Sequence, residues 1–112
     1  MEKHLHILWT NPDLITSEKM MFMYARNCLL QHWWDKVTVI IWGGTAKLAA
    51  ENENIQCRME ESRIAGVEFT ACVSCADQLG VTEKLLELEV DVKPWGKLLT
   101  ELIQKGKPLL TV

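Results

Sequence analysis

The chain has 112 residues, of which 48% are apolar and 24% charged, and its formal net charge is −3. This length predicts a single domain over residues 1–112, which can bury its own core without a stabilising disulfide or structural metal ion. The excess of acidic residues (15 against 12 basic), with no dense basic run, argues against nucleic-acid binding. No apolar stretch approaches the roughly 20 residues of a membrane span, and no signal-peptide core follows Met1, so we expect a cytoplasmic protein.

Strand-like and helix-like segments alternate along the chain. The first strand is expected over residues 4–9, where apolar side chains recur at every second position. Turn residues at 10–13 lead into a long helix, with Ser17 as its expected N-cap and an end near residues 34–35. Four apolar residues with helical spacing form its expected buried stripe: Phe22, Ala25, Leu29 and Trp33.

A nearly continuous apolar run at 37–42 is typical of a central strand buried on both faces of a parallel sheet. The elements expected after it are a short helix at 46–50 capped by Thr45, a helix at 53–65, a strand at 67–72, a short helix at 74–79, a helical turn starting at Thr82, a strand at 90–92, a helix ending at Gly106 and a strand at 109–112. This order predicts an α/β fold: a flavodoxin-like, three-layer domain with a five-stranded parallel sheet and helices on both faces.

Ligands in open α/β sheets gather at the carboxyl ends of the strands. Of the three strand ends that can be read here, only residues 72–75 carry a reactive side chain. Cys72 closes a strand, and Cys75 falls in the first turn of the next helix, where unpaired N–H groups and the helix dipole stabilise a thiolate. The two thiols could form a disulfide, or Cys75 could resolve a sulfur-modified Cys72. Plain core filling explains two such cysteines as well.

Other site chemistries find less support in the sequence. A single Cys-x-x-Cys is not a zinc site, and no second pair with ligand spacing comes from Cys57, His4, His6 or His32. The Gly43-Gly44-Thr45 segment matches neither the dinucleotide nor the P-loop fingerprint, so we expect no bound cofactor, although a small ligand there is left open. Cys28 and Cys57 fall within expected helices and are interpreted as small buried hydrophobes.

The five tryptophans are numerous for so short a chain. Trp33 and Trp34 are consecutive, so they cannot both enter one small core. Trp9 and Trp42 lie at strand ends, where they could line an apolar pocket around the thiols or finish the sheet core. Trp95 precedes the last helix. Because surface tryptophan is enriched at interfaces, we expect self-association.

The heptapeptide Gly-Val-Glu-Phe-Thr-Ala-Cys at 66–72, followed by Gly80-Val81, resembles the DsrE/DsrF-like family, which includes the TusD-type sulfur-relay proteins. Segments 85–92 and 98–103 are similar too. The resemblance implies that Cys72 accepts sulfane sulfur as a persulfide and passes it to a partner thiol, with proteins or small thiols as donor and acceptor. It also implies rings built from trimers or dimers of trimers. Cys75 is not required by the family pattern, and several members lack the reactive cysteine.

Three hypotheses follow from the sequence. The first is a sulfur carrier, a candidate sulfurtransferase, that uses Cys72 and belongs to a homo-oligomer such as a trimer or hexamer. The second is a non-catalytic binding or assembly module of the same fold. The third is a Cys72/Cys75 dithiol redox protein that handles no sulfane sulfur.

Overall fold

Five parallel strands form a single sheet in the order β4-β3-β2-β1-β5. The computed structural model describes residues 1–112. The strands are β1 (His4–Trp9), β2 (Lys36–Ile41), β3 (Glu68–Cys72), β4 (Asp91–Lys93) and β5 (Leu109–Thr111). The all-parallel sheet confirms the predicted fold class.

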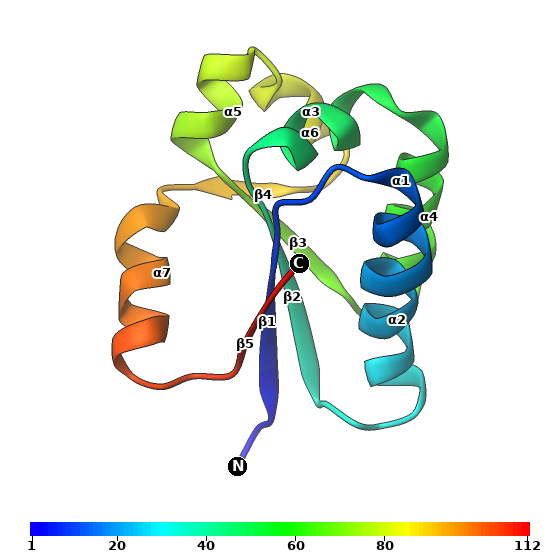
Figure 1. Ribbon diagram of the computed structural model, residues 1–112, viewed down its shortest axis with the longest axis vertical. Helices are drawn as coiled ribbons and strands as arrows, with labels where there is room; N and C mark the ends of the chain where they lie inside the picture. The colour runs from blue at the N-terminus through cyan, green and yellow to red at the C-terminus, as the bar shows by residue number, and fades with distance from the viewer.

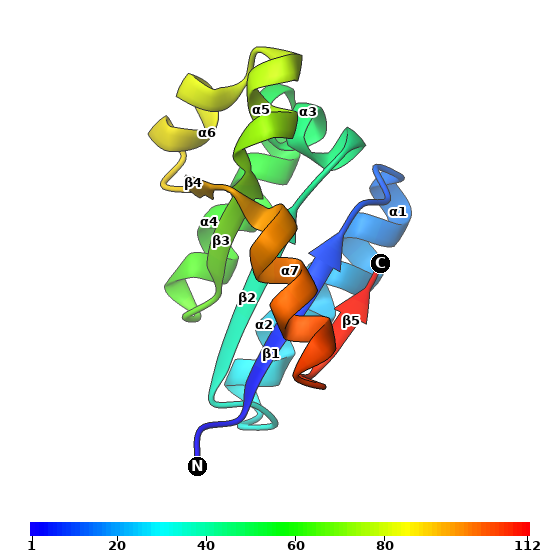
Figure 2. The ribbon, with the colours of Figure 1, turned by 90° about the vertical axis from the view of Figure 1, so that its left-hand side faces the viewer.

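The helices form a layer on each face of the sheet and a cap over one end (Figures 1 and 2). They are α1 (Leu14–Thr16), the π-helical η1 (Ser17–Phe22), α2 (Met23–Leu30), α3 (Gly44–Glu51), α4 (Glu53–Ile64), α5 (Val73–Leu79), α6 (Thr82–Glu87) and α7 (Trp95–Gln104). The α1-η1-α2 run and α4 cover one face, and α7 alone lies on the other. Helices α3, α5 and α6 gather beyond the carboxyl ends of β2 and β3 (Figure 1). None of these helices has the length and apolar character needed to cross a bilayer.

The core is divided unequally between the two faces. The main cluster holds 22 buried residues, whereas only Ile40, Cys72 and Trp95 form the buried cluster on the α7 side. The central strand β2 serves both clusters, because Val37, Val39 and Ile41 enter the first and Ile40 the second. This two-sided burial is the physical reason for the continuous apolar run in its sequence.

The first helical segment begins earlier than predicted. Its N-cap is Asp13, whose carboxylate accepts the Thr16 backbone N–H at 2.8 Å. Ser17, the predicted cap, is fully buried inside the segment, where its hydroxyl accepts the Trp9 indole N–H at 3.0 Å. Aspartate and serine are equally good N-caps, so residue preference does not decide which of the two begins the helix. The tertiary hydrogen bond to Trp9 engages the Ser17 hydroxyl and leaves Asp13 as the cap.

The same segment also ends earlier than predicted, at Leu30. His32 adopts a left-handed conformation with φ of 58°, which a helix cannot accommodate. Trp33 therefore lies beyond the helix with 54% of its surface exposed, and the prediction that it joins the buried stripe is wrong.

The other elements lie within two residues of their predicted bounds, but Thr45 does not cap α3. The N-cap is Gly43, and Thr45 lies inside the first turn. Its buried hydroxyl instead donates to the Trp9 carbonyl at 2.6 Å, tying α3 to the end of β1. A long-range hydrogen bond of this kind leaves no local signal in the sequence.

Candidate functional site

A cleft of about 600 Å³ lies at the carboxyl edge of the sheet, below the cap formed by α3 and α5. Its walls come from three strand ends: the Trp42–Gly44 loop after β2, residues 72–75 after β3 and residues 94–96 after β4. Both Cys72 and Cys75 line it, so we name it the cysteine cleft. The structure thus places the sequence-predicted site residues together at the edge where parallel sheets bind ligands.

Cys72 is the last residue of β3 and the N-cap of α5. Its extended backbone (φ −72°, ψ 120°) turns the chain from strand to helix, and no side chain caps the helix. The residue is 6% exposed and packs with Ile40 and Trp95 at the floor of the cleft. A small donor or acceptor can therefore reach this thiol only through the cleft.

Cys75 is the third residue of α5 and half-buried in the wall. Its sulfur accepts the Gly43 backbone N–H at 3.2 Å and lies 3.8 Å from the Gly43 carbonyl oxygen. The two contacts with Gly43 fix the position of the Cys75 sulfur in the wall of the cleft. Gly43 reaches this position with φ of 74°, a conformation that side-chain-bearing residues rarely adopt.

The contribution of Gly43 to the cysteine pair was missed by the sequence reasoning, which treated the Gly-Gly turn as a separate loop. The signal that could have revealed it is positional, because the turn follows β2 and the cysteines follow its neighbour β3. The carboxyl ends of adjacent parallel strands meet at one edge of the sheet.

The N-cap and third positions of a helix face each other, which is why side chains at these positions bond reciprocally in capping boxes. Cys72 and Cys75 occupy these two positions of α5, and Cys75 packs against the cluster that contains Cys72. The backbone thus presents two thiols to one cleft.

Two tryptophans form apolar walls of the cleft, but they are only partly the predicted pair. Trp42 lines the cleft, and so does Trp95, whose indole N–H donates to the Thr70 hydroxyl at 2.7 Å. Trp9 instead lies fully buried in the main core, 5.2 Å from the Phe22 ring between centroids. Of the two alternatives open for these strand-end tryptophans, Trp42 thus lines the cleft, whereas Trp9 completes the core on the opposite face of the sheet.

The two remaining cysteines lie outside the cleft. Cys28 is fully buried in the main core, where burial raises the pKa of its thiol against the smaller effect of a hydrogen bond with Tyr24. Cys57 is exposed on α4, so the expectation that it is buried is wrong. Its helical spacing could not reveal which face of α4 turns to solvent.

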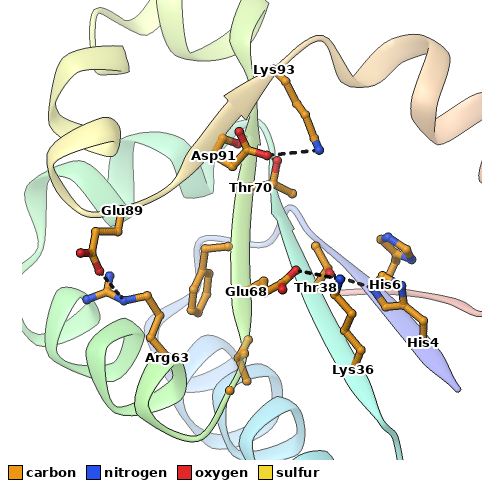
Figure 3. Close-up of a pocket in the computed structure, with 13 residues that line it drawn as sticks. His4, His6, Lys36, Thr38, Arg63, Glu68, Thr70, Glu89, Asp91 and Lys93 are labelled. Carbon is orange, nitrogen blue, oxygen red and sulfur yellow. Dashed lines mark hydrogen bonds and ion pairs between the residues drawn. The ribbon is translucent and has the colours of Figure 1, made fainter. Parts of the chain in front are cut away.

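A second hollow, of about 580 Å³, occupies the part of the sheet face that α7 leaves open (Figure 3). We call it the polar sheet face, because charged and hydroxyl side chains of β2, β3 and β4 line it, joined by Arg63 of α4 and Glu89 of the turn before β4. Its charges are paired: Lys36 with Glu68 at 3.5 Å, Lys93 with Asp91 at 3.1 Å and Arg63 with Glu89 at 3.2 Å (Figure 3).

Two histidines lie side by side on this polar sheet face. The His4 and His6 rings are 4.1 Å apart between centroids, and His4 Nε2 is 2.8 Å from the Thr38 hydroxyl. Burial and the nearby His4 and Lys36 lower the pKa of His6 from 6.5 to about 4. Burial, followed by Lys36, also lowers the pKa of His4. Both rings are therefore neutral at pH 7. No group of three or more His, Cys, Asp or Glu side chains is arranged to hold a metal ion.

Comparison with known proteins places the chain in a family. It belongs to the DsrE/DsrF-like family, whose model matches residues 7–112. Among solved structures, it is similar to the conserved protein of unknown function BT1422 from Bacteroides thetaiotaomicron, with a TM-score of 0.95 and 32% identity over 98% of this chain and 95% of the other. A protein of unknown function from Methanobacterium thermoautotrophicum, MTH1491, shares the fold with a TM-score of 0.79 and 16% identity over 99% of this chain and 100% of the other. No curated protein matches the sequence.

Proposed function

We propose that the protein is a sulfur carrier that holds sulfane sulfur as a persulfide on Cys72 and passes it to a partner thiol. The observation that carries the proposal is the position of Cys72 at the floor of a cleft, at the carboxyl end of β3, in a chain of the DsrE/DsrF-like family. The low exposure of this cysteine shields a bound persulfide, and the cleft leaves one route of attack.

The proposed transfer involves two thiol–persulfide exchanges. The Cys72 thiolate attacks the outer sulfur of a donor R–S–SH, forming Cys72–S–SH while R–S⁻ leaves. An acceptor thiolate then attacks the outer sulfur of Cys72–S–SH and takes it as a new persulfide, which restores the Cys72 thiolate. Each exchange breaks one S–S bond and forms another, so no separate oxidant or reductant is consumed.

Cys75 offers a second fate for the persulfide. Its thiolate can attack the inner sulfur of Cys72–S–SH, forming a Cys72–Cys75 disulfide and releasing hydrosulfide, after which a small thiol must reduce the disulfide. The Gly43 N–H donates to the Cys75 sulfur at 3.2 Å and so holds this thiol in the wall of the cleft that Cys72 also lines. The same contact supports the second candidate function, a dithiol redox protein that cycles between the two thiols and their disulfide.

We further propose that the protein works in the cytoplasm as a homo-oligomer. The chemistry requires reduced thiols, which are maintained in that compartment, and all four cysteines are free. Self-association is supported by large apolar side chains left at the surface, among them Trp33 at 54% and Ile64 at 79% exposure. Proteins or small thiols would then act as sulfur donor and acceptor.

The test is sulfur loading followed by intact mass measurement. All proteins carry Cys57→Ser, which removes the exposed thiol outside the cleft, and each is treated with a small persulfide or with a persulfidated cysteine desulfurase. We expect the parent and Cys75→Ser to gain one sulfur and Cys72→Ser to gain none. Failure of every form to load, with both donors, would contradict the carrier and favour the non-catalytic assembly module. A reversible disulfide in the parent, together with no sulfur gain in Cys75→Ser, would instead favour the dithiol redox protein, because Cys75→Ser cannot discharge a persulfide as a disulfide.

A further inference from the structure

The charge lining the cysteine cleft is one-sided. Lys47, on α3, is the only side chain with a permanent charge among the lining residues, and no carboxylate lines the cleft. Lys47 is exposed and takes part in none of the ion pairs of the chain. Glu51, one helical turn further along, lies outside the cleft and lines a neighbouring hollow that Lys47 also borders. The Lys47 ammonium group is therefore the only charge that lines the cleft, and no carboxylate of the cleft neutralises it.

The rest of the lining suits the body of a small organic molecule. The rings of Trp42 and Trp95 and the exposed side chain of Leu79 supply apolar surface, and Ser74 and Gln78 supply neutral hydrogen-bonding groups. The volume of about 600 Å³ falls within the range of roughly 300–1,000 Å³ typical of small-molecule sites. A cleft with apolar walls, a single cation and two thiols matches a ligand that is small, partly apolar and anionic.

We propose that Cys72 is loaded by a low-molecular-weight persulfide that bears a carboxylate, with Lys47 holding the carboxylate while the outer sulfur meets Cys72. This inference rests on the proposed carrier function and specifies its donor. The Cys72 thiolate displaces the donor thiolate from its outer sulfur, so the carboxylate-bearing thiolate R–S⁻ leaves with the electron pair of the broken S–S bond. Lys47 takes no part in bond making and acts as a binding residue.

The experiment compares two donors that differ in one group: the persulfide of N-acetylcysteine and that of N-acetylcysteine amide. The rate of sulfur loading on Cys72 is measured by intact mass in the Cys57→Ser protein. Each rate is divided by the rate at which the same donor transfers sulfur to free mercaptoethanol, which removes intrinsic differences in reactivity. We expect the carboxylate donor to load about threefold faster, as an exposed ionic contact provides, and the preference to shrink as salt is added.

Two lysine variants carry the same change in charge. Lys47→Gln should bring the ratio of the two rates close to one. Lys105→Gln should keep the full ratio, because Lys105 lies just past the end of α7 and borders a different hollow. An equal rate for both donors in the parent protein, or a preference that survives in Lys47→Gln, would overturn the inference while loading at Cys72 still upholds the carrier function. Loading from the persulfidated desulfurase alone would likewise overturn the carboxylate donor and uphold the carrier function. No loading from any donor would overturn the donor inference and the carrier function together.

Discussion

The cysteine cleft and the polar sheet face are hollows of similar size, about 600 and 580 Å³, but the charges are paired on the polar sheet face and unpaired in the cysteine cleft. Three ion pairs neutralise the charges of the polar sheet face: one joins β2 to β3, one lies within β4 and one joins α4 to the turn before β4 (Figure 3). In the cysteine cleft, Lys47 has no partner and Cys72 has no hydrogen-bonded neighbour. The two hollows therefore differ in the pairing of their charges rather than in volume, and on the polar sheet face it is a neutral group, the buried Nδ1 of His6, that lacks a hydrogen-bond partner.

The difference follows from where each hollow lies on the sheet. Charges at the starts of neighbouring strands can pair across the sheet: Lys36 and Glu68 are the first residues of β2 and β3, and their side chains form an ion pair at 3.5 Å. Residues at strand ends, such as Cys72, lie where the chain leaves the ladder and helices begin. Backbone N–H groups are left free at these points, and one of them, from Gly43, reaches the Cys75 sulfur.

Trp95 tests the contrast between the cysteine cleft and the polar sheet face, because its ring contacts both regions. One side of the ring lines the cysteine cleft, and Lys93 of the polar sheet face lies 5.5 Å from its centroid. Trp95→Ala should lower the free energy of unfolding by about 3 kcal/mol, since it opens the buried cluster around Cys72 and leaves the Thr70 hydroxyl without its donor. Urea unfolding measures the change.

Trp33→Ala is the matched control, because it removes the same side chain from a position that is 54% exposed. Its effect should stay within about 0.5 kcal/mol at protein concentrations where light scattering shows a monomer, because loss of a subunit contact through Trp33 would add to it at higher concentration. Equal losses in the two variants would show that the cluster around Trp95 does not hold the two regions together.

Most of the fold could be predicted from the sequence because its signals are local. The apolar run at 37–42 and the glycine stops at Gly66 and Gly80 record burial and helix termination within a few residues. The two errors in helix capping share a cause that is not local. Ser17 and Thr45 were assigned as caps by residue type, but each hydroxyl is bonded to Trp9, a partner on β1.

The candidate site was predictable in part for the same reason. Cys72 and Cys75 are neighbours in sequence, so their placement at one strand end followed from the pattern. Gly43 and Lys47 reach the cleft only through the pairing of β2 with β3, which no local motif encodes. Tertiary pairing also decided that Trp95, rather than Trp9, lines the cleft.

His6 gives the polar sheet face a pH dependence. Burial, His4 and Lys36 lower the pKa of His6 from 6.5 to about 4 in the folded protein. Between these values the unfolded chain binds a proton that the folded chain does not, so the contribution to stability is complete above pH 6.5 and is lost as the pH falls to 4. We expect a loss of roughly 1–2 kcal/mol, less than the full shift because solvent screens the partly exposed ring.

Urea unfolding between pH 7 and pH 4 measures this contribution. His6→Gln should make the profile shallower without removing it, because the pKa of His4 is lowered as well. His32→Asn should leave the profile as it is, because His32 is exposed and asparagine tolerates its left-handed backbone. A profile that is equally steep in His6→Gln would mean that groups other than this ring govern the acid sensitivity.

The smallest expected effect concerns the ion pair between Lys36 and Glu68, whose side chains are 38% and 56% exposed. A double-mutant cycle with Lys36→Gln and Glu68→Gln should give a coupling energy below about 1 kcal/mol, because solvent and salt screen exposed pairs. The cycle is measured by urea unfolding, with the oligomeric state followed by light scattering. A coupling energy clearly above that range, growing with protein concentration, would mean that a second copy covers the polar sheet face and removes the pair from water. The two hollows would then differ because one is open to solvent and the other is a subunit interface. In that case, the paired charges on the polar sheet face would mark where copies of the chain meet.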